Sequence, residues 1–572
     1  MTSSQRHADG GHERPGEALR LGFVLWVTVS VFLFLLARCA YICLVRGPVF
    51  TEMAVAQRAL SVPVASARGA ITDREGEVLA ASAGGPAPGP PFTHAAIFPQ
   101  AVRGPSSSIA VLERSLGPLS AGNPRVVRLP ADHSHELAEA ARSVVGVVPF
   151  QLSGRAVSAA VHAVGHLSAA SVGLDGLEAS FQWALGSARQ SYVRLAVDAD
   201  GRCIAGLGAS ASSRGAQGGA GWTGYVRTTL SLPLQRAAEE ALAKQGAPGA
   251  VVVLDVRTGQ VLAMASAPVY DPGDVAAELG REGAPMLNRA VRAYYPGSVF
   301  KVVVAAAALE AGVRPQEWRY TDEGSIAVGS NVFRCAASEA GGHGSVGIGE
   351  MLALSCNTAA IALAEEVGAE AIRRQAQAFG IGDYAFRARL HLPSALSGRI
   401  GSVYDTASEA GLANLALGQL HVEMTPVEAA TMMAAVARGG EVCVPSLVLE
   451  AEAPSGQRVV YPATVSGGQA VSPATAETLR HMLEQAVDAG TASAALGGLD
   501  CAGKTGTAQT GRVNERGQPL YNAWFTGYAP RREPRIAVAV VLESTRSGAD
   551  AAAPVFRDIL AFWTRTQAQA SS

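Results

Sequence analysis

Lysine is nearly absent from this chain of 572 residues. Only Lys244, Lys301 and Lys504 occur among the 46 basic residues, so the other 43 are arginines. Lysine is normally among the commonest residues. A chain with this bias uses arginine wherever a positive charge is enough. The three lysines are therefore the first positions to inspect for chemistry that arginine cannot perform.

A surplus of charge of one sign is also missing. The chain has 46 basic and 48 acidic residues, which gives a net charge of −2. It therefore lacks the excess of positive charge that is typical of a nucleic-acid-binding protein. Apolar residues make up 48% of the chain, which excludes a fully disordered or collagen-like protein. A chain of this length exceeds one ordinary core, so we expect two or more domains.

Cysteine motifs are missing as well. The seven cysteines are dispersed, no two form a C-x-x-C pair, and none stands with histidine at the spacing of a zinc site. We therefore expect no metal and no cofactor, and we interpret most of these cysteines as small buried thiols. One disulfide bridge stays open as an alternative.

A long hydrophobic run is present near the N-terminus. Residues 21–37 carry no charge, and beyond Arg38 the apolar character continues to Val45. As a helix this stretch spans about 37 Å, enough for a hydrocarbon core of about 30 Å. The sequence predicts a single membrane anchor over 21–45 after a tail over 1–20. Basic residues are balanced on its two sides, so charge alone leaves the orientation open.

The rest of the chain divides into two regions. Residues 46–222 contain an extended segment, 68–80, with a turn signal, and no catalytic constellation. A stretch rich in Gly, Ala and Ser, 206–224, predicts a flexible connection. Residues 223–566 predict an α+β domain with an antiparallel sheet, and 567–572 form a tail. Its expected parts are a hairpin (249–256 and 261–267), a helical middle (298–490), three strands (501–510, 522–530 and 535–544) and a closing helix (552–565).

Lys301 belongs to the first motif that carries chemistry. It follows Ser298 by three positions, at the start of an apolar helix that ends near Gly312. Positions i and i+3 share a helix face, so we expect the lysine to lie over the serine hydroxyl. A buried lysine can have a lowered pKa and take the serine proton, and the helix N-terminus favours a developing oxyanion. This S-x-x-K pair alone is weak evidence, because a surface lysine can also have a serine at that distance.

Two further motifs strengthen the interpretation. The stretch K-T-G-T, 504–507, opens a strand and offers one cation, two hydroxyls and an approachable backbone, a set suited to a carboxylate. Between the two lysines, Ser355 and Asn357 stand at the head of another helix. Ser355 can relay a proton, and Asn357 can hold a peptide amide through its donor and its acceptor. Two of only three lysines thus fall in the motifs.

In this order, S-x-x-K, S-x-N and K-T-G resemble the serine acyl-transferases of the penicillin-binding protein and β-lactamase group. The surrounding sequence is similar to a class B penicillin-binding protein, a peptidoglycan D,D-transpeptidase, over 225–565 and more thinly over 46–222. One departure is Leu420, where the family often has glycine, and it bears on the shape of that loop. The matching stretches include RGAITDR, GAVVVLDVRTGQVLAMAS, PGSVFK, HG (343–344), SCNTA, KTGTAQ and AWFTGYAP.

The resemblance implies a fold and a set of roles. The fold is a serine acyl-transferase domain with a five-stranded antiparallel sheet and a helical subdomain, preceded by an elongated pedestal- or dimerisation-type domain. Ser298 would be the acylated nucleophile, Lys301 its base and Ser355 the proton relay. Substrate would be bound by Asn357, Lys504, Thr505, Gly506 and Thr507, and the backbone N–H groups of Ser298 and Thr507 would form the oxyanion hole.

The resemblance also implies a place and partners. The N-terminus would lie in the cytoplasm and the catalytic domain outside the membrane. Peptidoglycan stem peptides would be the substrates, β-lactam antibiotics the inhibitors, and a polytopic glycan polymerase of the SEDS type the partner. No nucleic acid is expected. The sequence leaves open whether the protein serves elongation, division or sporulation, which cross-link it makes and its oligomeric state.

Four other functions are alternatives to that of a monofunctional transpeptidase. A β-lactam hydrolase needs a base for deacylation, and Glu409 and Asn414 do not have the class A spacing. A bifunctional synthase needs a glycosyltransferase domain, and a β-lactam sensor needs several membrane spans and a protease motif; neither is found. A non-enzymatic scaffold of division or envelope assembly is the alternative of a different class, and the intact motifs argue against it.

Overall fold

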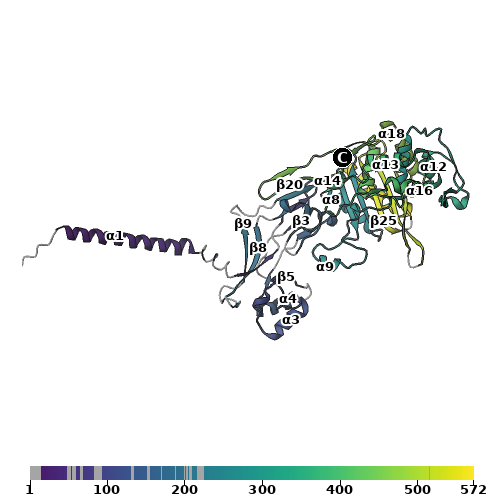
Figure 1. Ribbon diagram of the computed structural model, residues 1–572. Coiled ribbons are helices and arrows are strands. Elements are labelled where there is room, and N and C mark those ends of the chain that lie inside the picture. The colour runs from purple at the N-terminus through teal and green to yellow at the C-terminus, as the bar shows by residue number, and fades with distance from the viewer. Residues whose placement is uncertain are drawn as a thin grey trace, which may run out of the picture. The chain divides into compact units, whose positions relative to one another are not determined.

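A computed structural model gives the protein's structure (Figure 1). It describes residues 15–47, 50, 53, 59–64, 68–82, 93–129, 134–150, 155–168, 171–186, 189–198, 200, 202, 204, 209–215, 224–513, 516–545 and 547–571. The chain forms two compact units. Unit 1 comprises 1–63, 87–151 and 192–212, and unit 2 comprises 64–86, 152–191 and 213–572. The units interleave along the sequence, whereas the predicted domains are contiguous, and the predicted functional division stays a prediction.

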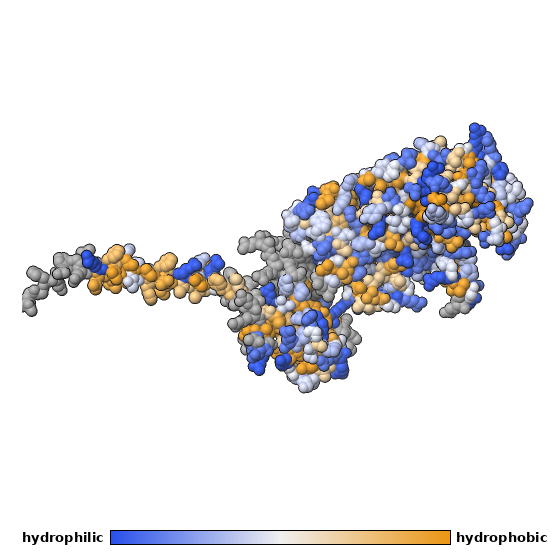
Figure 2. Space-filling model, in the orientation of Figure 1, coloured by the Kyte–Doolittle hydropathy of each residue, from blue (hydrophilic) through white to orange (hydrophobic). Residues whose placement is uncertain are grey.

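Helix α1 (Pro15–Ala40) lies in unit 1 and continues as a π-helical turn, η1 (Tyr41–Val45). Residues 20–45 are long and apolar enough to cross a membrane. Large side chains such as Phe23, Trp26 and Phe34 are exposed along this helix, and Figure 2 shows hydrophobic residues over most of its length. An exposed apolar surface of this length is stable only against another apolar phase, and it fits a single membrane anchor.

A small α/β layer forms the core of unit 1. Strands β5 (Arg125–Arg128), β4 (His94–Ile97) and β6 (Val147–Phe150) pair antiparallel in that order. Helices α3 (Ser106–Leu116) and α4 (Ser134–Ser143) share its core through Leu112 and Leu137.

Another sheet of three strands corrects one expectation. Its order is β1 (Ala59–Val64), β8 (Arg189–Ala196) and β9 (Ala209–Gly215). Strand β9 lies inside 206–224, where the composition predicted a flexible connection. Backbone pairing with β8 outweighs the weak strand propensity of Gly, Ala and Ser there. The flanking residues 206–208 and 216–223 lie outside the described residues.

Unit 2 contains a sheet of six strands. Its order is β21 (Arg458–Val460), β20 (Val448–Glu452), β10 (Tyr225–Thr228), β2 (Ala70–Thr72), β3 (Val78–Ser82) and β7 (Arg155–Val157). Asp73 fixes the turn between β2 and β3, since its Oδ1 accepts bonds from the N–H groups of Glu75 and Glu77 at 2.8 and 2.9 Å. The predicted turn is therefore confirmed.

The central sheet of unit 2 has five strands. Their order is β12 (Val261–Ala267), β11 (Gly249–Asp255), β25 (Ile536–Thr545), β24 (Pro519–Ala529) and β23 (Ala502–Val513), and all neighbours are antiparallel. The predicted hairpin joins β11 to β12. The two segments of sequence that supply these strands are separated by the helical middle, as predicted.

Helices cover both faces of this sheet, which explains why its strands are almost wholly apolar. Alternate residues of β11 face opposite ways. Val251 and Val253 belong to the core with α8 (Leu232–Ala243) and α20 (Ala553–Ser571), while Val252 and Leu254 belong to the core with α17 (Pro426–Ala437). Strand β23 is the edge of the sheet.

The helical lobe contains α10 (Lys301–Glu310), α11 (Ile348–Ala353), α12 (Asn357–Val367), α13 (Ala369–Ala378), α16 (Glu409–Ala416) and α18 (Pro473–Asp488). Helix α10 is buried on every side from Lys301 to Ala308 and contacts α12, α13 and α18. In Figure 1, α12, α13, α16 and α18 gather at one end of unit 2. Short paired strands also occur in this predicted helical middle, among them β13 (Tyr320–Asp322) with β16 (Gly344–Val346) and β14 (Ser325–Val328) with β15 (Asn331–Arg334).

Candidate active site

Ser298 lies in a tight 3-10 turn, η4 (Gly297–Phe300), that leads directly into α10. Gly297 has a φ of +55°, and a Cβ there would lie 2.8 Å from the Thr507 carbonyl oxygen of β23. Only glycine combines this backbone conformation with so close an approach. The Gly297 N–H donates to the Gly418 carbonyl at 3.0 Å. The serine turn is therefore held between β23 and the loop at 418.

Gly506 makes the matching approach from the strand. A Cβ at this position would lie 2.7 Å from the Pro296 carbonyl oxygen. Since β23 is an edge strand, one row of its backbone groups is not used by β24. The first and third motifs thus meet through backbone, as the glycine of K-T-G suggested.

Lys301 connects the first motif to the second. Its side chain is fully buried, and Nζ donates to the Ser355 carbonyl at 2.6 Å and to Asn357 Oδ1 at 2.7 Å. A longer contact, 3.4 Å, reaches the Ser355 hydroxyl. The lysine is expected to lie over the Ser298 hydroxyl, and among the described residues its hydrogen bonds go to the second motif. A carbonyl and an amide oxygen are both fixed acceptors, and they hold the ammonium.

Burial lowers the pKa of Lys301 to about 8, and the nearby Cys356 and Cys335 oppose part of this shift. Desolvation disfavours the charged amine, because water can no longer solvate it. About a tenth of the amine is therefore neutral at pH 7. This is the property that a general base requires and that an arginine lacks.

The second motif is held from several directions. Ser355 has a φ of +58°, and Cys356 caps the start of α12. Asn357 donates from Nδ2 to the Arg334 carbonyl at 3.0 Å while its Oδ1 accepts from Lys301. Each end of the amide keeps one further hydrogen-bonding position. Asn357 can therefore still bind a peptide amide while it serves as a brace.

The third motif contains a second fully buried lysine. Lys504 Nζ donates to the Thr505 carbonyl at 3.0 Å, and burial together with the positive charge of Lys301 lowers the pKa of Lys504. The Thr505 hydroxyl lies 2.6 Å from that of Thr491. The Thr507 side chain is exposed, and its hydroxyl accepts from the Gly548 N–H at 3.2 Å. Of the polar side chains of this motif, that of Thr507 is exposed, whereas those of Lys504 and Thr505 are buried.

A cluster next to the second motif was missed by the sequence reasoning. Asp322, Cys335, His343 and Cys356 bring one potential ligand atom each within 4.8 Å of one another. The sequence shows no metal-ligand spacing here, because these residues come from four separate segments. His343 and Cys356 lie in stretches that resemble the family, but no local pattern marks them as partners.

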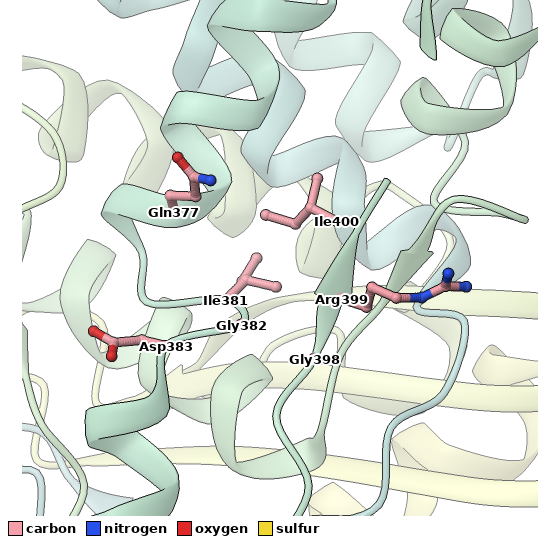
Figure 3. A pocket seen from close by; sticks show the side chains of 7 residues that line it. All are labelled: Gln377, Ile381, Gly382, Asp383, Gly398, Arg399 and Ile400. Carbon is pink, nitrogen blue, oxygen red and sulfur yellow. The ribbon is translucent and has the colours of Figure 1, made fainter. Parts of the chain in front are cut away.

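A separate open pocket of about 410 Å³ lies in the helical lobe (Figure 3). It is lined by Gln377, Ile381, Gly382, Asp383, Gly398, Arg399 and Ile400. The side chains of Ile381 and Ile400 face each other across it, while Arg399 points away. None of the motif residues lines this pocket.

Comparison with known proteins agrees with this geometry. The family model described as the penicillin binding protein transpeptidase domain matches residues 249–561. This range contains all three motifs and more than half of the chain. The chain belongs to the penicillin-binding protein transpeptidase family. The family and the fold class predicted from the sequence are therefore confirmed.

Individual relatives agree with the assignment. The peptidoglycan D,D-transpeptidase PbpA of Mycolicibacterium smegmatis is 33% identical over 365 residues, covering 59% of this chain and 72% of that protein. A solved D,D-transpeptidase domain of a peptidoglycan glycosyltransferase from Eggerthella lenta has a TM-score of 0.62 at 25% identity and covers 88% of this chain and 99% of its own. Penicillin-binding protein 3 of Mycobacterium tuberculosis in complex with ampicillin has a TM-score of 0.61 at 25% identity, covering 89% of this chain and 96% of its own.

Proposed function

We propose that this transpeptidase is monofunctional and cross-links peptidoglycan stem peptides through an acyl-enzyme on Ser298. The Ser298 hydroxyl attacks the carbonyl carbon of the peptide bond between two terminal D-alanines. The serine oxygen forms an ester as that C–N bond breaks, and the terminal D-alanine leaves with the proton. The amine of a second stem peptide then attacks the ester, forms the cross-link and restores the serine.

The observation that carries this proposal is the environment of Lys301. The lysine is fully buried, its pKa is lowered to about 8, and its bonds join the helix of Ser298 to Ser355 and Asn357. Catalytic hydrogen bonds often tighten only when substrate is bound. Neutral Lys301 therefore acts as the base toward Ser298, with Ser355 as the proton relay to the leaving amine.

Binding and charge stabilisation are assigned to the β23 edge. The N–H groups of Ser298 and Thr507 form the oxyanion hole, and the close contact of Gly297 with Thr507 supports this assignment. Asn357, Thr505 and Thr507 hold the peptide and its carboxylate, and Gly506 allows the close approach. Lys504, whose side chain is buried on one side of β23, contributes its positive charge.

The membrane orientation and partners belong to the same proposal. Helix α1 anchors the chain, the N-terminus lies in the cytoplasm, and the catalytic domain lies outside, where peptidoglycan is built. A polytopic glycan polymerase of the SEDS type supplies the strands. Added protease should therefore digest the Ser298 domain in intact spheroplasts. Protection until lysis would contradict this orientation.

Penicillin tests the chemistry of the proposal. The full-length chain, purified in detergent, should form a covalent adduct on Ser298 that is seen by intact mass and peptide mapping. The Ser298→Ala variant should form none. The adduct should persist, because the chain lacks the class A spacing of a base that activates water for deacylation. Glu409, the candidate for that base, is exposed and lies beside Gly329.

Three results would decide against this mechanism. An adduct on another residue would remove Ser298 as nucleophile. Rapid turnover of penicillin, with the adduct never accumulating, would favour a β-lactam hydrolase. A folded wild-type chain without any adduct would favour the scaffold alternative, and a thermal melt establishes that it is folded.

A further inference from the structure

Four potential ligand groups converge beside the second motif. Asp322 ends β13, Cys335 follows β15, His343 precedes β16, and Cys356 caps α12. Pairing of β13 with β16 places Asp322 opposite Gly344, next to His343. The Cys335 N–H donates to the Gly324 carbonyl at 2.9 Å, which fixes the third segment near the first.

The ligand atoms form a closed ring of contacts. Cys335 Sγ lies 3.3 Å from His343 Nδ1, which lies 2.7 Å from Asp322 Oδ2. The same oxygen lies 3.3 Å from Cys356 Sγ, and the two sulfur atoms are 3.7 Å apart. All four atoms thus point at one common centre.

These separations match a tetrahedral zinc site. Two thiolates bound to one Zn²⁺ at about 2.3 Å lie about 3.8 Å apart, and a sulfur and a nitrogen or oxygen ligand lie about 3.5 Å apart. The sulfur–sulfur distance of 3.7 Å fits the first value and is far from a disulfide bond of about 2.05 Å. Of the four contacts around the ring, that of His343 with Asp322 must open by less than an ångström, and the two pairs across the ring lie within 4.8 Å.

The surrounding groups hold the ligands in place. Asp322 Oδ1 accepts from the Thr358 hydroxyl at 2.7 Å and from the Gly324 N–H at 2.8 Å, which leaves Oδ2 directed into the ring. Asp322, Cys335 and Cys356 are buried, and His343 is nearly so. Metal ligands are commonly oriented by such outer hydrogen bonds. A buried group of two thiols, an imidazole and a carboxylate has the donor set that zinc prefers.

We propose that Asp322, Cys335, His343 and Cys356 bind one Zn²⁺ ion in a closed, structural site. The metal holds the second motif through two of its ligands, Cys356 and Cys335. Cys356 stands between Ser355 and Asn357, and Cys335 follows Arg334, whose carbonyl accepts from Asn357 at 3.0 Å. The four ligands are positioning residues: they act on Ser298 chemistry only through Lys301 and its acceptors. Metal binding itself does not rest on the proposed function.

Metal content tests this proposal directly. The full-length chain, purified in detergent under reducing conditions, should contain about one zinc per chain by elemental analysis. Removal by a chelator and addition of Co²⁺ should produce the absorption bands of a tetrahedral thiolate site. Cys335→Ala and His343→Ala should each lose the stoichiometric metal and these bands. Cys443→Ala, a buried cysteine outside the ring, is the matched control and should keep both.

The chelator experiment keeps the test independent of how the variants fold. Removing zinc from the wild-type chain should lower the melting temperature and slow acylation by penicillin, and adding zinc should restore both. A folded, reduced wild-type chain that contains no zinc and takes up no Co²⁺ would overturn the proposal. A Cys335–Cys356 disulfide in the freshly purified chain, seen as a loss of two hydrogens in mass, would also overturn the proposal if the chain still binds no metal after reduction.

Discussion

Lys301 and Lys504 are both fully buried, but they are held by different kinds of neighbours. Lys301 on α10 bonds across to Ser355 and Asn357, more than fifty residues away. Lys504 bonds to the carbonyl of the next residue, Thr505, on its own strand. Burial alone therefore does not define a role. Under the proposed function, Lys301, which joins two motifs, moves the proton, and Lys504 supports the strand from its buried side.

Lys244 completes this comparison as the exposed case. Its side chain is about half exposed and lies near Glu240 and Asp558, at 3.2 and 3.8 Å. Rarity in the sequence thus pointed to two buried motif lysines and one ordinary surface charge. An exposed ion pair of this kind contributes little to stability, so Lys244 is a matched control for changes at the other two.

The largest effect should come from Lys301→Arg. Acylation by penicillin should fall by about 10²–10⁴-fold, because a guanidinium cannot accept the serine proton at neutral pH. The acylation rate of Lys301→Met should fall by a similar factor, since this change removes the amine without adding bulk. The measurement is the second-order rate of acylation, with the melting temperature recorded for each variant. Lys244→Arg should match the wild type. A Lys301→Arg protein that acylates within a few-fold of wild type would remove the base from the mechanism.

Lys504→Met should have a smaller effect. The methionine keeps the volume of the buried chain but removes the charge and the bond to Thr505. The acylation rate should fall by about 10- to 100-fold, equivalent to the ~1.5–3 kcal/mol of a hydrogen bond to a charged group. The loss should appear as weaker binding, with the limiting rate of acylation largely kept. A limiting rate as low as that of Lys301→Met would erase the difference between the two lysines.

The pH dependence should follow Lys301 in the wild type. Its pKa is lowered from 10.5 to about 8, so the neutral amine grows as the pH rises through 8. Between pH 7 and pH 9 the neutral fraction increases from about a tenth to about nine tenths, and acylation should rise by about 10-fold. Rates of penicillin acylation across this range test it. Lys504→Met should keep the rise, and a flat wild-type profile would contradict the assignment of the base.

The smallest effect concerns the loop that supports the serine turn. Leu420 has a φ of +53° and is about half exposed, so the chain keeps at this position a conformation that suits glycine. Relief of about 1–2 kcal/mol of backbone strain outweighs the added entropy of an unfolded glycine, about 0.4–1 kcal/mol. Leu420→Gly should therefore raise the free energy of unfolding by up to about 1 kcal/mol. The control Val460→Gly, on strand β21, should lower the free energy of unfolding instead. If Leu420→Gly also lowers it, Leu420 is not strained.

Much of the fold was accessible from the sequence because its signals are local. The hairpin of β11 and β12, the turn at Asp73 and the helix that begins at Asn357 each depend on residues within one short segment. Strand β9 was missed, since its composition favours a loop and only pairing with β8 makes it a strand. The interleaving of the two units was missed for a similar reason: it depends on contacts between distant segments.

The family and the residues that carry the motifs follow from the sequence alone. A serine and a lysine three positions apart, a glycine that allows close approach and a lysine in an arginine-rich chain are all properties of short segments. What those residues contact depends on the tertiary structure. It directed Lys301 to Ser355 and Asn357, and it joined Asp322, Cys335, His343 and Cys356, which span up to 34 residues of sequence. Strand pairing and helix packing create such contacts, and no local period of the sequence encodes them.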